Sequence, residues 1–261
     1  MSKSIGAKTP ECEPFIEIVR CIMIFIRVSC PEKPLLGGKP VTWKSIMRTC
    51  IELENRNRFE LPVEFQDDDV RYSESIVEYF LRKVTRENDV VFDPFAGFGT
   101  TLLVAEAMGR MPLGIEYDEE RVKYIQSKLK QPDRIIHGDS RQLLSYDLPA
   151  FDFSITSPPY TSRHEIEDPF TAYTTNGDGY TSYLKDIRSI YEQMGQVMAF
   201  DARVVIEVAN IKYGDSVTTL AWDIAKEISK VLHFEGEVVV SWDSYGYGYD
   251  HSYCLVFSKA S

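Results

Sequence analysis

The chain has few of the groups that hold metal ions or cross-link secreted proteins. No two of its five cysteines form a Cys-x-x-Cys pair, and a nine-residue spacing between three of them fits neither a zinc knuckle nor a redox pair. These cysteines are Cys12, Cys21, Cys30, Cys50 and Cys254. We therefore expect reduced thiols, no metal site and a cytoplasmic protein.

Long apolar runs are also missing. The most apolar early stretch, from Phe15 to Val28, is interrupted by Glu17, Arg20 and Arg27, and it lacks the flanks of a secretory signal. It is too short and too charged to span a bilayer, and its periodicity does not decide between a strand and a buried helix. We expect no association with a membrane. The chain also has no internal repeat and no low-complexity tract.

Basic charge is scarce. The chain has 261 residues, with 29 Lys and Arg against 40 Asp and Glu, and a formal net charge of −11. This balance argues against broad electrostatic attraction to nucleic acid, whose phosphates are usually met by Lys and Arg. A local basic patch or a basic partner is still compatible with it. The length suits one large α/β domain, with or without a small appendage.

From residue 89 onward, short apolar runs alternate with amphipathic segments. Such alternation predicts a mostly parallel sheet with helices on both faces. The predicted strands are 90–92, 113–115, 134–137, 151–156, 204–209, 237–242 and 253–257, and the last two are too close for a helical crossover. These two strands should form an antiparallel hairpin. Upstream, the pattern predicts helices over 43–53, capped by Thr42, and over 74–84, capped by Ser73.

The first predicted strand of the sheet runs into Asp93-Pro94-Phe95-Ala96-Gly97-Phe98-Gly99-Thr100-Thr101. Gly97 and Gly99 permit positive φ and a close approach of a ligand to the backbone. Loops of this kind often hold a pyrophosphate. Here Asp93 would repel a phosphate and favour a cationic amine, which disfavours a nicotinamide-dependent oxidoreductase.

Acidic residues follow the next two strands. Glu116, about 20 residues after the loop, is placed to accept hydrogen bonds from ribose hydroxyls, while Asp118 and Glu119 open the next helix. Asp139, with Ser140 beside it, is placed to accept from an adenine amine. Three acidic strand tips at one edge of a sheet indicate a nucleoside that carries a positive charge.

The fourth strand ends in Thr156-Ser157-Pro158-Pro159-Tyr160. The two prolines fix φ and lack backbone donors, so the strand stops in a stiff turn that displays carbonyls, a hydroxyl and a ring. On its own this is as consistent with a plain turn as with a site. Beside an acidic pocket, it becomes a clamp for a flat group that carries an NH2.

The glycine loop and Ser-Pro-Pro-Tyr together resemble the N4-cytosine and N6-adenine amino-methylating DNA methyltransferases, over roughly residues 65–258. The resemblance implies a Rossmann-like, seven-stranded α/β sheet with an antiparallel C-terminal hairpin, and S-adenosylmethionine as cofactor. It assigns the methionine part of the cofactor to the loop, the ribose to Glu116 and the adenine to Asp139. The expected cofactor residues are Ser73, Asp93, Phe95, Ala96, Gly97, Gly99, Thr100, Glu116, Tyr117, Asp139 and Ser140.

The resemblance also implies the catalytic residues Ser157, Pro158, Pro159 and Tyr160. Ser157 Oγ and the Pro158 carbonyl would accept the protons of an exocyclic amine, and Tyr160 would stack on an extruded base. The Ser form of the motif favours cytosine N4 over adenine N6. Because the cysteines Cys12, Cys21, Cys30 and Cys50 precede the catalytic domain and none follows a proline, methylation at cytosine C5 is not expected.

The chain has little room for a separate reader of a DNA sequence. We expect a catalytic domain over 65–261 and an N-terminal extension over 1–64, with a substrate loop over 161–180. This leaves open a structured RNA substrate in place of DNA, or a protein partner that supplies recognition. A non-catalytic, cofactor-binding subunit is a further alternative, which the intact Ser-Pro-Pro-Tyr motif disfavours.

Overall fold

The computed structural model describes residues 47–259 apart from 67–68, 244 and 246–247. The apolar run from Phe15 to Val28 and the start of the helix expected from Trp43 lie outside the described residues. Residues 47–261 form one compact unit. Within the described part of the chain, no helix is long and apolar enough to cross a membrane.

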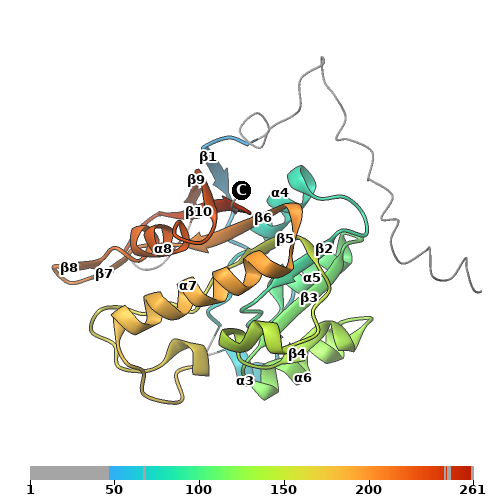
Figure 1. Cartoon of the computed structure of the whole chain (residues 1–261), viewed down its shortest axis with the longest axis horizontal. Helices are drawn as coiled ribbons and strands as arrows, with labels where there is room; N and C mark the ends of the chain where they lie inside the picture. Colours follow the sequence, from blue (N-terminus) through green and yellow to red (C-terminus); the bar gives the residue numbers. More distant parts are fainter. Residues whose placement is uncertain (1–46, 67–68, 244, 246–247, 260–261) are drawn as a thin grey trace, which may run out of the picture. The chain divides into compact units, whose positions relative to one another are not determined.

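An eight-stranded sheet forms the centre of this unit (Figure 1). Its strands, in spatial order, are β1 (Cys50–Leu53), β9 (His233–Trp242), β10 (His251–Ser258), β6 (Met198–Val208), β5 (Phe151–Thr156), β2 (Val90–Asp93), β3 (Met111–Glu116) and β4 (Ile135–His137). Only β10 runs antiparallel to its neighbours β6 and β9. The predicted fold class, a mostly parallel α/β sheet with an antiparallel C-terminal pair, is confirmed.

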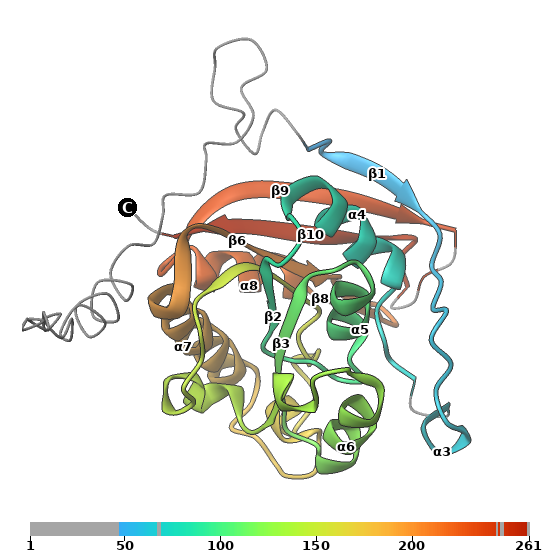
Figure 2. The same cartoon turned by 90° about the vertical axis from the view of Figure 1, so that its right-hand side faces the viewer.

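Helices cover both faces of the sheet (Figure 2). One face carries α4 (Glu74–Val84), α5 (Thr100–Ala107) and α6 (Glu119–Lys128), and the other carries α7 (Tyr180–Val197) and α8 (Leu220–Ile228). The stripe that α7 buries consists of Tyr183, Ile187, Ile190, Tyr191 and Met194. Its residues recur every three or four positions, which is the spacing of one helix face.

Helix α4 begins where the sequence predicts. Ser73 caps it, because its side chain accepts a hydrogen bond from the Ser75 amide. Asp118 caps α6 in the same way and accepts from the amides of Glu120 and Arg121. Smaller elements complete the unit: α3 (Val63–Gln66), η1 (Pro132–Arg134), η2 (Ser140–Ser145), η3 (Pro169–Thr171), β7 (Ile211–Tyr213) and β8 (Ser216–Thr218).

The sheet has one strand more than predicted, because residues 50–53 form β1. The helix predicted over 43–53 is wrong for these four residues. They pair in parallel with β9, whose Val239 amide donates to the Thr49 carbonyl at 2.9 Å, and Ile51 is buried. The pairing provides hydrogen-bond partners for the backbone at one edge of β9. This contact, with residues almost 190 positions away in the sequence, outweighs the local apolar spacing that favours a helix. This strand lies upstream of residue 65, where we expected the catalytic domain to begin.

The order of the strands places a crevice at the centre of the sheet. From β2 the chain proceeds through β3 to β4 on one side, and β5 then pairs with the other side of β2. In open α/β sheets, ligands bind outside the carboxyl ends of the strands at such a switch point. The predicted loop after β2 and the predicted turn after β5 both begin there.

Candidate active site

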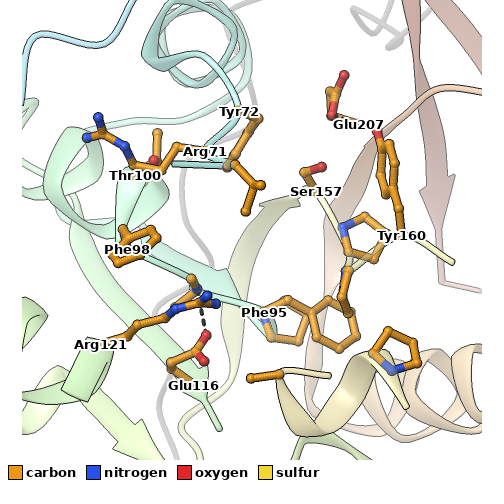
Figure 3. Close-up of a pocket in the computed structure, with 18 of the residues that line it drawn as sticks. Arg71, Tyr72, Phe95, Phe98, Thr100, Glu116, Arg121, Ser157, Tyr160 and Glu207 are labelled. Carbon is orange, nitrogen blue, oxygen red and sulfur yellow. Dashed lines mark hydrogen bonds between the residues drawn. The ribbon is translucent and has the colours of Figure 1, made fainter. Parts of the chain in front are cut away.

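A cavity of about 590 Å³ lies at the carboxyl ends of the strands (Figure 3). This volume is within the range of small-molecule sites. We distinguish two sides by their residues. The glycine-loop side comprises Pro94–Phe98, Thr100, Glu116, Tyr117, Arg121, Gly138 and Ser140, and the Ser-Pro-Pro-Tyr side comprises Ser157–Tyr160, Glu207, Trp242 and Tyr245.

The loop after β2 needs its glycines. Gly97 and Gly99 have φ values of +54° and +82°. A Cβ at Gly99 would lie 2.9 Å from Ile125 Cγ1, so this residue also permits α5 to approach α6. Around Gly97 the nearest atom to such a Cβ would be 4.0 Å away, so the loop leaves space on the cavity side there.

Glu116, at the tip of β3, fixes the loop to the next strand. Its Oε2 accepts from the Gly97 amide at 2.7 Å, and its Oε1 accepts from the Asp118 amide at 2.9 Å. Burial raises the pKa of this carboxyl, and the two amides and Arg121 act in the opposite direction. Each carboxylate oxygen has two lone pairs, so each can still accept from a ligand hydroxyl.

Asp93 occupies a different place from the one expected. Its side chain is 0% exposed and does not line the cavity. Oδ1 accepts from the Phe95 amide at 2.9 Å, which holds the start of the loop. Burial raises the pKa of Asp93 to about 6, although the hydroxyls of Thr101 and Thr156 and the Phe95 amide lower it. The residue therefore shapes the loop from beneath.

Asp139 is also engaged elsewhere. Its carboxylate pairs with Arg141, with Oδ2 2.7 Å from Nη2, and it caps η2 by accepting from the Arg141 amide. Asp139 lines a separate hollow beside Tyr117, whereas Ser140 lines the main cavity and donates to the Pro94 carbonyl. The structure thus brings Ser140, and not the Asp139 carboxylate, to the cavity wall.

All but one of the remaining expected cofactor residues reach the cavity. Phe95, Ala96, Thr100 and Tyr117 line it, whereas Gly99 lies behind the wall. Ser73 lines it too, but its hydroxyl is occupied in capping α4 and in holding the Arg56 backbone.

All four residues of Ser157-Pro158-Pro159-Tyr160 line the opposite side. Hydrogen bonds fix the turn: the Pro159 carbonyl accepts from Tyr183 Oη at 3.0 Å, and the Tyr160 carbonyl accepts from Tyr173 Oη at 2.6 Å. The Tyr160 hydroxyl accepts from the Ala209 amide at 2.9 Å and donates to Glu207 Oε2 at 3.3 Å. The ring of Tyr160 is therefore held against the cavity at both ends.

Sequence reasoning missed three lining residues on this side: Glu207, Trp242 and Tyr245. Glu207 lies on β6 and is 2% exposed. The sequence pattern that could have indicated it is an acid inside the apolar run 204–209, because burying a charge costs free energy unless it is paired or functional. Tyr245 belongs to the Tyr/Gly-rich connection before β10, and its ring stacks on Trp242 at 5.8 Å between centroids.

Four lining residues were also missed on the glycine-loop side: Pro94, Phe98, Arg121 and Gly138. The Arg121 guanidinium lies 4.7 Å from the centroid of the Phe98 ring, and both residues line the cavity. Phe98 is the variable position between Gly97 and Gly99, so no motif marked it. The pair adds a flat cationic and aromatic surface beside Glu116.

These residues fit S-adenosylmethionine. Glu116 can accept from two ribose hydroxyls. The acids of the cavity wall outnumber its bases, with Asp69, Glu116 and Glu207 against Arg71 and Arg121, which is compatible with a sulfonium. Aromatic surfaces of Phe95, Phe98 and Tyr117 suit adenine. Among the described residues, no group of three or more His, Cys, Asp or Glu could hold a metal ion.

Solved structures define the class of the fold. TrmN from Thermus thermophilus matches with a TM-score of 0.54 and 16% identity, over 78% of this chain and 55% of that chain. A TehB-like SAM-dependent methyltransferase from Corynebacterium glutamicum matches with a TM-score of 0.50 and 14% identity, over 76% and 93%. The fold is that of the class I S-adenosylmethionine-dependent methyltransferases.

Sequence comparison relates part of the chain to one family within that class. Residues 55–127 match the family model described as DNA methylase, of the N6 and N4 type. Type II methyltransferase M.HinfI from Haemophilus influenzae is 38% identical over 152 residues, 58% of this chain and 38% of the relative. Over these residues the chain is similar to the N6/N4 DNA methylases. It spans between 14% and 38% of the length of the curated relatives that it matches.

Proposed function

We propose that this protein is an S-adenosylmethionine-dependent methyltransferase acting on the exocyclic amine of a base in DNA, with N4 of cytosine as the target atom. The observation that carries the proposal is that one cavity joins the glycine loop to the Ser-Pro-Pro-Tyr turn. A site for a nucleoside cofactor and a clamp for an amine must share a cavity for direct transfer between them. The family match supports DNA as the substrate.

The glycine-loop side would hold the cofactor, which supplies a methyl group on a sulfonium. Glu116 would accept from the ribose hydroxyls, Ser140 and Tyr117 would border the adenine, and the loop backbone would border the methionine part. Phe95 of this side has its ring 5.8 Å from that of Phe170, which also lines the cavity. We assign the catalytic domain to residues 65–261 together with β1, and a recognition or partner-binding role to the rest of residues 1–64.

The Ser-Pro-Pro-Tyr side would hold the base. The lone pair of an exocyclic amine is delocalised into the ring, which makes the amine a poor nucleophile. If Ser157 Oγ and the Pro158 carbonyl accept its two protons, the nitrogen becomes more tetrahedral and its lone pair is directed at the methyl group. Tyr160 would stack on the extruded base, because this amine cannot be reached inside a duplex.

Cytosine N4 is favoured over adenine N6 by the serine at position 157, the form typical of the N4 members. The loop over 161–180, which we propose to contact the substrate, folds against α8 through the ion pair of Arg163 with Asp223 at 3.2 Å. Its short length favours recognition with the help of a protein partner or of residues 1–64.

The test is transfer of a tritiated methyl group from S-adenosylmethionine by the purified full chain. DNA and ribosomal RNA are supplied separately, and the labelled nucleoside is identified by mass spectrometry. We expect label in DNA as N4-methyldeoxycytidine. Label as N6-methyldeoxyadenosine would overturn the choice of base, and label in RNA alone would overturn the choice of DNA. Binding of the cofactor without transfer to either polymer would favour a non-catalytic subunit.

A further inference from the structure

Glu207 is the buried charged residue of the Ser-Pro-Pro-Tyr side that the family motifs leave unexplained. It lies near the end of β6, is 2% exposed and lines the cavity beside Ser157. Figure 3 shows Ser157, Tyr160 and Glu207 together on one side, away from Glu116, Phe98 and Arg121. A carboxyl in this position costs free energy unless hydrogen bonds or a function compensate for it.

Four hydroxyl groups surround this carboxyl. Tyr245 Oη donates to Oε1 at 2.8 Å, and Tyr160 Oη donates to Oε2 at 3.3 Å. The hydroxyls of Ser157 and Ser252 lie close enough to lower its pKa. These four groups come from the turn after β5, from the connection before β10 and from β10 itself, so sheet pairing assembles them.

Two of these hydroxyls accept from other partners and keep their own protons available. The Tyr160 oxygen accepts from the Ala209 amide at 2.9 Å, and Ser252 Oγ accepts from Trp242 Nε1 at 2.9 Å. The hydroxyl protons of Tyr160 and Ser252 can therefore be donated to Glu207 or to the neighbouring Tyr245 hydroxyl. Donors of this kind favour the ionised, accepting form of the carboxyl, whereas its burial raises the pKa.

The other titratable groups near Glu207 remain protonated where Glu207 can ionise. Tyr72, which precedes α4, and Cys254 on β10 both interact electrostatically with Glu207, and burial raises the pKa of each well above its ordinary value. Tyr245 behaves in the same way, because burial and Glu207 both raise its pKa. The carboxyl is therefore the group of this cluster that can ionise while Tyr72, Tyr245 and Cys254 stay protonated.

We propose that Glu207 accepts, through the Ser157 hydroxyl, the proton that the target amine loses on methylation. This inference rests on the proposed function. A C–N bond forms as the C–S bond of the cofactor breaks, and the electron pair stays on sulfur. The nitrogen then transfers one proton to Ser157 Oγ, whose own proton passes to Glu207 and later to water. By accepting from Ser157, Glu207 also turns the lone pairs of Oγ toward the amine.

A purely structural carboxyl would affect stability but would not control the pH dependence of transfer. The proposed role requires ionised Glu207, so the rate should fall as the pH falls through its pKa. Burial raises that pKa, so the fall should lie above the ordinary range of a glutamate. The four hydroxyls lower the pKa, so removing one of them should move the fall to higher pH.

The experiment measures single-turnover methyl transfer against pH for the full chain with saturating S-adenosylmethionine and the DNA that the wild type methylates. In the profile of rate against pH, Glu207→Gln should lower the rate at the high-pH plateau at least about 100-fold, the usual contribution of a positioned base. It should also remove the fall in rate at low pH, which we call the acidic limb. Glu207→Asp should retain the limb. Tyr245→Phe, which removes one donor to Glu207, should shift the limb to higher pH. Glu237→Gln, at an exposed position on β9, is the matched control.

If Glu207→Gln transfers methyl groups at the wild-type rate and keeps the acidic limb, the inference is overturned and the methyltransferase proposal stays intact. An unshifted limb in Tyr245→Phe would also overturn it, and this second test applies even if Glu207→Gln fails to fold. Absence of transfer by the wild type would instead refute the proposed function. Binding of S-adenosylmethionine by each variant separates loss of chemistry from loss of structure.

Discussion

The glycine-loop side and the Ser-Pro-Pro-Tyr side of the cavity differ in the length of chain that builds them. The first is made mainly by residues 94–140, through backbone contacts such as the Gly97 amide to Glu116. The second draws on residues 157–160, 207, 242 and 245, through a network of side-chain hydroxyls around one carboxylate. The comparison indicates that the residues proposed to bind the cofactor are close together in the sequence, whereas the residues proposed to act on the base are brought together by tertiary structure.

If the two sides act independently, Ser157→Ala should strongly reduce the rate of methyl transfer without changing cofactor affinity, and we expect this to be the largest effect. It removes an acceptor for the amine and the link to Glu207, and we expect the rate to fall about 100-fold. The affinity for S-adenosylmethionine should change less than about twofold, because Ser157 lies away from Glu116 (Figure 3). Single-turnover kinetics and calorimetric titration measure the two quantities.

Ser189→Ala, at an exposed position on α7, is the control for that substitution. Loss of cofactor affinity in Ser157→Ala, with a normal rate at saturation, would contradict the separation of the two sides.

Glu116→Gln should show the reverse pattern with a smaller effect. An amide can accept through only one of its two polar atoms, so either the Gly97 or the Asp118 amide would face another donor. We expect affinity for S-adenosylmethionine to weaken about tenfold, within the range for hydrogen bonds to a charged group. The transfer rate at saturating cofactor should stay within about threefold of the wild type.

Titration of S-adenosylmethionine followed by rate measurements at saturation tests this, with Glu119→Gln at an exposed position of α6 as the control. A rate that stays low at saturation would mean that Glu116 also positions the reacting atoms.

The difference between local and long-range contacts also explains which parts of the fold could be predicted from the sequence. The seven strands of the main sheet other than β1, the helix starts at Ser73 and Asp118 and the glycine loop follow from local spacing and backbone chemistry. Strand β1 does not, because its pairing with β9 depends on residues that are distant in the chain.

Side-chain direction limited the prediction of the site in the same way. Asp93 and Asp139 were correctly placed near strand tips, but the first points beneath the loop and the second pairs with Arg141. Glu207 and Tyr245 meet only because β6 pairs with β10, which no motif encodes. A single acid within an apolar strand was the one signal available.

Asp93 joins the two sides from beneath and gives the smallest predicted effect. It holds the Phe95 amide and lies near Thr101 and Thr156, the last residue of β5. Its pKa is about 6 in the folded protein, above the ordinary 3.8, so the folded state binds a proton more tightly than the unfolded state. Its contribution to stability is therefore present at low pH and is lost as the pH rises through this window.

Asp93→Asn removes that titration while keeping an acceptor for the Phe95 amide. The free energy of unfolding of the wild type should fall relative to Asp93→Asn by about 1 kcal/mol between about pH 5 and about pH 6. Urea denaturation at each pH measures this difference, and Asp133→Asn at an exposed position of η1 controls for a change of net charge. Parallel pH dependences of the wild type and Asp93→Asn would show that the carboxyl beneath the loop stays ionised, and the acid would then be available to a cationic ligand after all.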